Sequence, residues 1–275
     1  MTEKNKPNIL VIPDIHGRTF WKKDLEKFPK DKYPELDIVF LGDYVDPYDF
    51  EGITRLDAIN NFKEIIDIAK TDNRIHLLIG NHDMHYWYDS YYKSRVDKQN
   101  YNKIKDMFLQ NFTLFNIAFD KKINNEFFLF THAGVNKPWL EHLHFIGDYS
   151  FKSNFGKVTE DQKEYFTFLK NIRPCAEDLN RLKLNFQGQA NLWMASYARG
   201  GDYNVGSCIW EDLSEWMFEG MEIKGIWQIF GHSRWSKPNP DEPYINKKRK
   251  FACVDTCSSW IIDNEGNIIK ADDYE

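Results

Sequence analysis

Short runs of apolar residues recur along the chain, and each is bounded by glycine or polar residues. Runs of four or five residues are too short for most helices, and their largely apolar character on both faces is typical of strands buried in a parallel sheet. The pattern predicts six strands, at residues 8–12 (NILVI), 37–41 (DIVFL), 75–79 (IHLLI), 127–130 (FFLF), 226–230 (IWQIF) and 251–254 (FACV).

An amphipathic helix is expected between the second and third of these strands. Thr54 and Asp57 have the spacing of a capping box, in which each side chain bonds the backbone of the other residue at the start of a helix. Apolar residues then recur at helical spacing, namely Leu56, Ile59, Phe62, Ile66 and Ala69. A strand, a helix and a second strand in this order predict a right-handed crossover between parallel strands.

Residues from about 145 to 225 contain few runs of the strand type. Because no repeat, glycine- and serine-rich linker or low-complexity tract divides the chain, we expect a single domain over residues 1–275. The segment at about 145–225 is then an insertion in that domain. We expect it to select the substrate, since binding residues often lie on variable segments that a rigid scaffold positions.

The composition is that of a globular protein, with 42% hydrophobic and 16% aromatic residues among 275. A net charge of -6 gives no general attraction for nucleic acid, which is therefore not an expected partner. No apolar run is long enough to cross a membrane, the first ten residues lack the apolar segment of a signal peptide, and the four cysteines do not form a disulfide framework. We expect a soluble, cytoplasmic protein with reduced thiols, and its oligomeric state stays open.

A side chain suited to metal binding follows almost every predicted strand. These residues are Asp14, Asp43, Asn81, His132 and His232, and the carboxyl ends of parallel strands meet at one edge of a sheet. Core packing does not explain them, because buried carboxylates and imidazoles cost free energy unless they have partners. The pattern therefore predicts a metal centre at this edge.

The ligand types indicate which metals the centre would hold. Carboxylate, imidazole and amide oxygen without thiolate suit manganese, iron or zinc at a catalytic site. Two ions need a bridging carboxylate, and Asp43, in the middle of the set, is the candidate for holding them about 3.5–4 Å apart. We expect two divalent ions, manganese first with iron or zinc as alternatives, and a hydroxide shared between them as the nucleophile.

Five short motifs contain these positions. They are DIHG at 14–17, GDYVD at 42–46, GNHD at 80–83, HAG at 132–134 and GH at 231–232. Each motif alone is weak evidence, but all five in this order, each after an apolar run, closely resemble the calcineurin-like metallophosphoesterases. The resemblance implies an α/β fold, a four-layer αββα sandwich of two mixed sheets with the metals at the loops of one edge.

The resemblance also implies roles for individual residues. It implies six metal ligands, which are Asp14, His16 and Asp43 for the first ion and Asp43, Asn81, His132 and His232 for the second. It further implies that His82, supported by the carboxylate of Asp46, protonates the leaving oxygen. This role is physically reasonable, because an alkoxide needs a proton near neutral pH and a carboxylate keeps an imidazole protonated and oriented.

The last motif continues as GHSR at 231–234, without the second histidine of many phosphodiesterases in the superfamily. In this respect the chain resembles the branch with Ser/Thr protein phosphatases and symmetrical diadenosine tetraphosphate hydrolases. However, Pro47 stands where the protein phosphatases have the arginine that grips the substrate phosphate. Arg199, Arg18 and Arg234 are the candidates to replace it, and we favour Arg199, because flanking glycines let its backbone approach a ligand.

We therefore expect a metal-dependent ester hydrolase (EC 3.1) that cleaves a phosphate monoester, on a phosphorylated protein or a small molecule, by in-line attack of the bridging hydroxide. Hydrolysis of a dinucleotide polyphosphate or a phosphodiester in the same centre is the alternative. A phosphate-binding module without turnover is an alternative from another class. The acidic charge balance argues against a nuclease.

Overall fold

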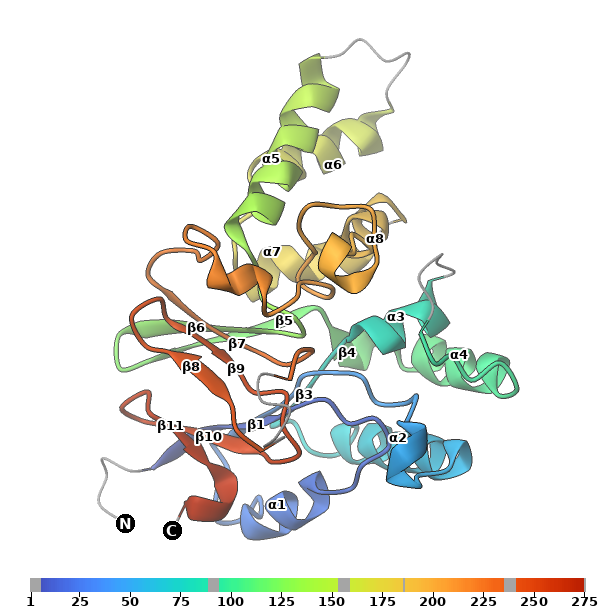
Figure 1. Ribbon diagram of the computed structural model, residues 1–275, viewed down its shortest axis with the longest axis vertical. Coiled ribbons are helices and arrows are strands. Elements are labelled where there is room, and N and C mark those ends of the chain that lie inside the picture. Colours follow the sequence, from blue (N-terminus) through green and yellow to red (C-terminus); the bar gives the residue numbers. More distant parts are fainter. Residues whose placement is uncertain (1–5, 89–93, 153–158, 185, 235–240, 275) are drawn as a thin grey trace.

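The computed structural model describes residues 6–88, 94–152, 159–184, 186–234 and 241–274 (Figure 1). Within these residues the strands form two sheets, and each sheet contains both parallel and antiparallel pairs. The first sheet has the order β11-β10-β1-β2-β3-β4 and the second the order β5-β6-β7-β9-β8. The strands are β1 (Pro7–Ile12), β2 (Asp37–Phe40), β3 (Ile75–Leu78), β4 (Phe115–Asn116), β5 (Ala118–Ile123), β6 (Glu126–Thr131), β7 (Ile226–Phe230), β8 (Tyr244–Asn246), β9 (Phe251–Cys253), β10 (Trp260–Asp263) and β11 (Ile268–Lys270).

Helices cover the outer faces of both sheets, which gives the four layers that the family resemblance implies. Figure 1 shows α1 and α2 below the first sheet and α5, α7 and α8 above the second. The α-helices are α1 (Trp21–Lys27), α2 (Arg55–Ala69), α3 (Asn81–Trp87), α4 (Tyr101–Gln110), α5 (Lys137–Lys152), α6 (Glu160–Lys170), α7 (Ala176–Arg181) and α8 (Phe186–Leu192). Short 3-10 helices lie at Asp49–Glu51, Phe112–Leu114, Leu182–Leu184, Tyr197–Arg199, Glu215–Met217 and Ala271–Asp273.

Alternate residues of the central strands pack into different apolar clusters. Ile9 and Val11 of β1 lie between the two sheets, whereas Leu10 and Ile12 pack on the side of the first sheet that the helices cover. Both faces of β1 are therefore buried. This burial is the physical reason for its continuous apolar sequence.

The six predicted strands and the predicted helix are confirmed. Helix α2 begins with the expected capping box, in which the Asp57 N–H donates to the Thr54 hydroxyl at 3.1 Å and the Thr54 N–H donates to the Asp57 carboxylate at 3.3 Å. The expectation for Leu56 was wrong, since this side chain is exposed at the first turn, whereas Ile59 and Phe62 are buried. The sequence pattern missed β4, β5, β8, β10 and β11. Strands β4, β8 and β11 have only two or three residues, and the exposed face of β5 is polar.

The chain between β6 and β7 forms helices α5 to α8, and its described residues add no strand to either sheet. Helix α5 packs against α6 and begins at Lys137, ahead of the expected start of the insertion near residue 145. The helices lie above the second sheet in Figure 1, on the side away from the first. None of the helices that the structure describes has the length and apolar composition that crossing a membrane requires.

Candidate active site

The predicted metal-binding side chains meet where the carboxyl ends of strands from both sheets come together. Asp43 and Asn81 follow strands of the first sheet, and His132 and His232 follow β6 and β7 of the second. Two contacts join the sheets here, because Nδ1 of His132 donates to the Leu41 carbonyl at 2.8 Å and the His232 N–H donates to the Asp14 carboxylate at 2.9 Å. All six predicted ligands, Asp14, His16, Asp43, Asn81, His132 and His232, are buried.

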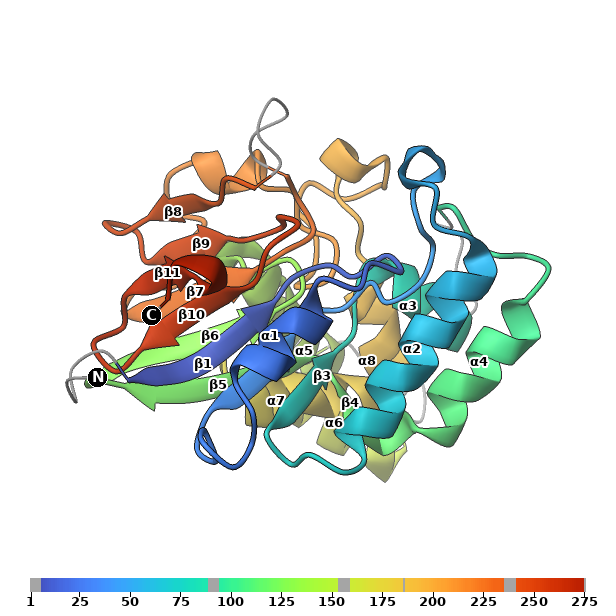
Figure 2. The same cartoon turned by 90° about the horizontal axis from the view of Figure 1, so that it is seen from below.

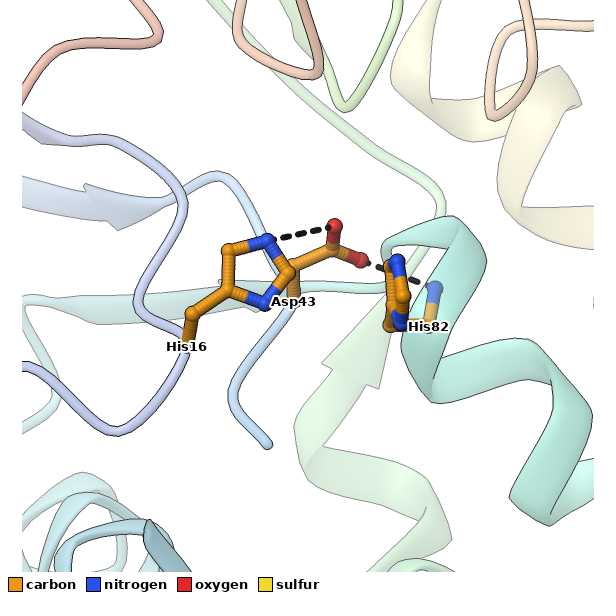
Figure 3. Close-up of side chains that lie close together, drawn as sticks. All are labelled: His16, Asp43 and His82. Atoms are coloured by element: carbon orange, nitrogen blue, oxygen red, sulfur yellow. Dashed lines mark hydrogen bonds and ion pairs between the residues drawn. The ribbon is translucent and has the colours of Figure 1, made fainter. Parts of the chain in front are cut away.

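Asp43 lies between His16 and His82 (Figure 3). Nε2 of His16 is 3.3 Å from Oδ2 of Asp43, and the backbone N–H of His82 donates to Oδ1 at 2.9 Å. Nδ1 of His16 faces the carbonyls of Val45 and Asp46, each at 3.1 Å, and therefore carries the ring hydrogen. The lone pair of Nε2 then points at the Asp43 carboxylate, with no hydrogen between them.

Asp43 belongs to two groups of ligand atoms that could hold an ion. One contains His16 and His82, and the other contains His132 and His232. Nε2 of His132 is 3.6 Å from Oδ2 of Asp43, 3.0 Å from Nδ1 of His232 and 3.0 Å from Oδ1 of Asn81. Among the described residues, Asp43 thus contributes to both groups that contain predicted ligands. This position is the one that a carboxylate shared by two ions would need.

Acceptor atoms with lone pairs face one another here, which is unfavourable unless a cation lies among them. Burial lowers the pKa of His132, so its ring is neutral, and the bond from Nδ1 to Leu41 leaves only a lone pair on Nε2. That lone pair can accept one hydrogen bond, whereas Oδ1 of Asn81, at 3.0 Å, has no hydrogen to donate. A divalent cation bound by the lone pairs removes the conflict, so the residues present fit a metal ion.

The electrostatics of the surrounding carboxylates also favour a cation. Burial, followed by repulsion from Asp255 and Asp43, raises the pKa of Asp14 well above its usual range. Burial and Asp43 raise the pKa of Asp83 as well, and burial raises that of Asp255 to about 6. Buried carboxylates held this close repel one another, and bound divalent ions would stabilise their ionised forms.

Asp14 and Asp83 are held by the backbone of neighbouring loops. Asp14 accepts the His232 N–H, and it is outside the two groups of ligand atoms that contain Asp43. The Asp83 carboxylate accepts the N–H groups of Asp43, Tyr44 and Gly80 at 2.7, 2.9 and 2.8 Å. It therefore ties the loop after β2 to the loop after β3, which holds Asp43 in place.

His82 lies in the first turn of α3 and contacts Asp46 with its side chain. Nδ1 of His82 is 3.1 Å from Oδ2 of Asp46. The same carboxylate accepts Nε2–H of His85 at 2.8 Å and the hydroxyl of Tyr86 at 2.5 Å. Asp46 is fully enclosed by these partners, so it can hold the His82 ring with Nε2 turned away from it.

Uncommon backbone conformations are concentrated at the site. Positive φ angles are rare outside glycine, yet His16 (44°), Asp43 (55°), Asp46 (59°) and His232 (67°) all adopt them. The loops also approach one another closely, since a Cβ atom on Gly80 would lie 2.2 Å from Oδ1 of Asp43. The glycine in the GNHD motif therefore allows the contact between the two loops.

The site opens into a pocket of about 170 Å³, which we call the catalytic pocket. Besides predicted ligands and His82, its described lining consists of Tyr48, Ser94, Arg95, Arg199 and Trp210. The pocket is smaller than the roughly 300–1,000 Å³ that encloses a drug-sized ligand. It is suited to one small anionic group with the rest of the ligand outside.

The three arginines predicted from the sequence are placed differently. Arg199 lines the catalytic pocket, where its Nη2 donates to the His232 carbonyl at 3.0 Å and its Nε is 2.7 Å from the Asp212 carboxylate. Arg18 binds the Glu51 carboxylate through two hydrogen bonds of 2.9 and 2.7 Å. Neither Arg18 nor Arg234 is among the described residues that line the pocket.

Sequence reasoning missed Arg95, which also lines the catalytic pocket. Its Nη2 donates to Nε2 of His82 at 3.2 Å, and its guanidinium carbon is 3.8 Å from the ring centre of Tyr48. No carboxylate among the described residues pairs with it, and its φ is 51°. Arg95 lies outside the motifs and follows no strand, so nothing in the sequence identified it.

His85 was missed as well, although a signal existed. It lies three residues after His82 on α3, and residues at this spacing share one face of a helix. Its side chain is buried and binds Asp46. The helical spacing of the two histidines could have indicated a shared carboxylate.

Comparisons with known proteins gave one family model and a similar solved structure. A family model described as calcineurin-like phosphoesterase matches residues 7–233, which include all six predicted ligands. No curated protein matches the chain. Among solved structures, the chain is similar to a protein serine/threonine phosphatase from Saccharomyces cerevisiae with similarity to human phosphatase PP5, at 15% sequence identity and a TM-score of 0.43, covering 98% of this chain and 79% of that chain.

Proposed function

Because the chain belongs to the calcineurin-like phosphoesterase family, we propose that it is a metal-dependent phosphatase that hydrolyses a phosphate monoester. The observation that carries this proposal is the meeting of Asp43, the neutral histidines and Asn81 in a pocket that also contains His82 and two arginines. A module that only bound phosphate would not need an imidazole that Asp46 orients toward the ligand.

Two divalent ions would be held by the six predicted ligands, and their chemistry is polarisation of the phosphate and activation of water. Manganese is the first choice and iron or zinc are the alternatives, because the ligands are carboxylates, imidazoles and an amide oxygen without a thiolate. Nε2 of His82 accepts a hydrogen bond from Arg95 in the structure; once Arg95 contacts a bound phosphate instead, Nε2 would be free to hold a proton and deliver it to the leaving oxygen, while Asp46 stabilises the imidazolium. Nε2 of His132 and Oδ1 of Asn81, 3.0 Å apart, would both offer lone pairs to an ion.

The pocket favours a monoester over a diester. A phosphate monoester carries up to two negative charges, and Arg95 and Arg199 are cations on the pocket wall. A diester has one charge and a second organic arm, for which a pocket of about 170 Å³ leaves little room. Arg95 has no described carboxylate partner, so we propose it as the principal phosphate-binding arginine, with Arg199 beside it.

The direct test compares p-nitrophenyl phosphate with bis-p-nitrophenyl phosphate after the metals are removed with a chelator and manganese is restored. We expect the monoester to have a kcat/KM roughly tenfold or more above that of the diester, and we expect the activity to depend on the added metal. A faster diester would overturn the monoester assignment and leave the metal centre standing. Manganese-independent activity would contradict the metal-dependent mechanism.

Replacing Arg95 with alanine should lower kcat/KM for p-nitrophenyl phosphate by about ten- to a hundredfold, because a hydrogen bond to a charged group is worth roughly 1.5–3 kcal/mol. The loss should appear mainly in KM if Arg95 binds ground state and transition state alike. Steady-state kinetics of Arg95→Ala and Arg173→Ala provide the comparison, since Arg173 is exposed and pairs with Glu177 and Asp178 outside the pocket. Equal kinetics for the two variants would exclude Arg95 from phosphate binding.

A further inference from the structure

A second, larger and strongly basic pocket adjoins the catalytic one. It has a volume of about 820 Å³, and its cations are Arg55, Arg95, Lys98 and Lys105. Tyr101 and Asn102 also line it, and no carboxylate is among its described lining residues. In a chain of net charge -6, four cations around one cavity form a local site for anions. We call it the basic pocket.

Two helices and the loop before α4 form this basic pocket. Arg55 is the first residue of α2, and Tyr101 and Asn102 are the first residues of α4. Figure 2 shows α2 and α4 side by side. The N-terminal ends of helices carry partial positive charge, which adds to the charge of the four side chains.

Arg95 belongs to both pockets, so the two adjoin at this residue. Its Nη2 approaches His82 and His16 on the catalytic side, at 3.2 and 3.5 Å. Nη1 of Arg55 donates to the Arg95 carbonyl at 2.9 Å and lies 3.7 Å from Oδ1 of Asp46. Arg55 therefore links the wall of the basic pocket to the backbone of Arg95 and to the carboxylate that orients His82.

The two lysines of the basic pocket are available to a ligand. Within the described part of the chain, neither Lys98 nor Lys105 forms an ion pair, whereas surface lysines such as Lys22 and Lys23 pair with Glu64 and Asp272. Lys98 is exposed and Lys105 is half-buried. Unpaired ammonium groups around a cavity repel one another, and an anion between them would relieve this repulsion.

We propose that the basic pocket binds a second phosphate group of the substrate, on the leaving-group side of the ester that is hydrolysed. This inference rests on the proposed function, since it places the first phosphate in the catalytic pocket. A substrate that carries two phosphates would contact Lys98 and Lys105 with one and the catalytic pocket with the other, with Arg95 between them. The substrate class is thus a bisphosphorylated molecule rather than a simple monoester.

The test compares alkyl monophosphates with alkanediol bisphosphates of matched chain length, with manganese present. We expect the wild-type kcat/KM to be about tenfold higher for the best bisphosphate, and this preference to fall with added salt. In the double variant Lys98→Gln/Lys105→Gln, the ratio of kcat/KM for bisphosphate to that for monophosphate should fall about five- to tenfold. Each lost lysine charge should lower this ratio by roughly two- to threefold. Singly and doubly phosphorylated peptides, measured alongside, show whether a small molecule or a protein segment presents the second phosphate.

Lys63→Gln/Lys103→Gln is the matched control, since both lysines are exposed, lie on α2 and α4, and are outside the described lining of the basic pocket. Its ratio should equal that of the wild type. If monophosphates are hydrolysed but no bisphosphate is preferred in either series, or if the preference survives in Lys98→Gln/Lys105→Gln, the inference is overturned and the proposed function stands. If the metal-loaded protein hydrolyses no monophosphate, the proposed function itself fails.

Discussion

Replacing Asp43 with asparagine is expected to lower kcat by about a thousandfold or more and to reduce the bound metal. Asp43 takes part in both described groups of predicted ligands, with Oδ2 at 3.3 Å from Nε2 of His16 and 3.6 Å from Nε2 of His132. An amide lacks the negative charge that two cations would share. The loss of several kcal/mol of charge stabilisation corresponds to this fall in rate, since each 1.36 kcal/mol is a factor of ten.

Turnover of p-nitrophenyl phosphate in manganese-replete buffer, together with metal content by elemental mass spectrometry, measures this effect. Asp24→Asn is the matched control, because Asp24 is also a buried aspartate but lies on α1, outside the site. The control should retain both its metal and its turnover. An Asp43→Asn protein with full metal content and near wild-type kcat would refute the shared role of this carboxylate.

Replacing His82 with glutamine is expected to lower kcat by about a hundred- to ten-thousandfold for alkyl phosphates, whose leaving oxygen needs a proton. The side chain of His82 lines the catalytic pocket, and Asp46 holds its Nδ1 at 3.1 Å. The p-nitrophenolate leaving group is far less basic, so the loss for p-nitrophenyl phosphate should be much smaller. The dependence of kcat on leaving-group pKa, measured for the wild type and the variant, tests the assignment.

The comparison for His82 is His85→Gln. His85 binds the same Asp46 carboxylate, at 2.8 Å, but is outside the described lining of the catalytic pocket. It positions Asp46 and packs edge-to-face against the His82 ring, with the ring centroids 5.6 Å apart, but it does not line the described pocket, so its loss should be smaller and should not depend on the leaving group. If the rate falls equally for alkyl and p-nitrophenyl phosphates in His82→Gln, His82 has an electrostatic or positioning role and is not the acid.

The sequence by itself predicts the central strands and the candidate metal ligands that follow them. Strand burial is visible in local sequence, since residues such as Ile9 and Leu10 must both be apolar to pack on opposite faces of β1. The convergence of Asp43 and Asn81 also follows from local information, because parallel strands end at the same edge of a sheet. The family resemblance, confirmed by the family model over residues 7–233, supplies the relation between the two sheets.

The surroundings of the centre depend on contacts between segments far apart in the chain. The sequence offers Arg18, Arg199 and Arg234 as candidate cations and favours Arg199, but only the tertiary structure shows that Arg18 is paired with Glu51 and that Arg199 lines the pocket. Arg95 has no motif, yet its position beside Tyr48 makes it a pocket residue.

The basic pocket likewise exists only because α2 and α4 pack together and bring Arg55 close to Lys98 and Lys105.

The difference between what the sequence predicts and what only the tertiary structure decides has a physical cause. Strand burial and the order of strand ends depend on residues that are neighbours along the chain, so periodicity and spacing reveal them. Whether a side chain is available for a ligand depends on whether an opposite charge from a distant part of the chain pairs with it. Only the packing of the folded chain decides that.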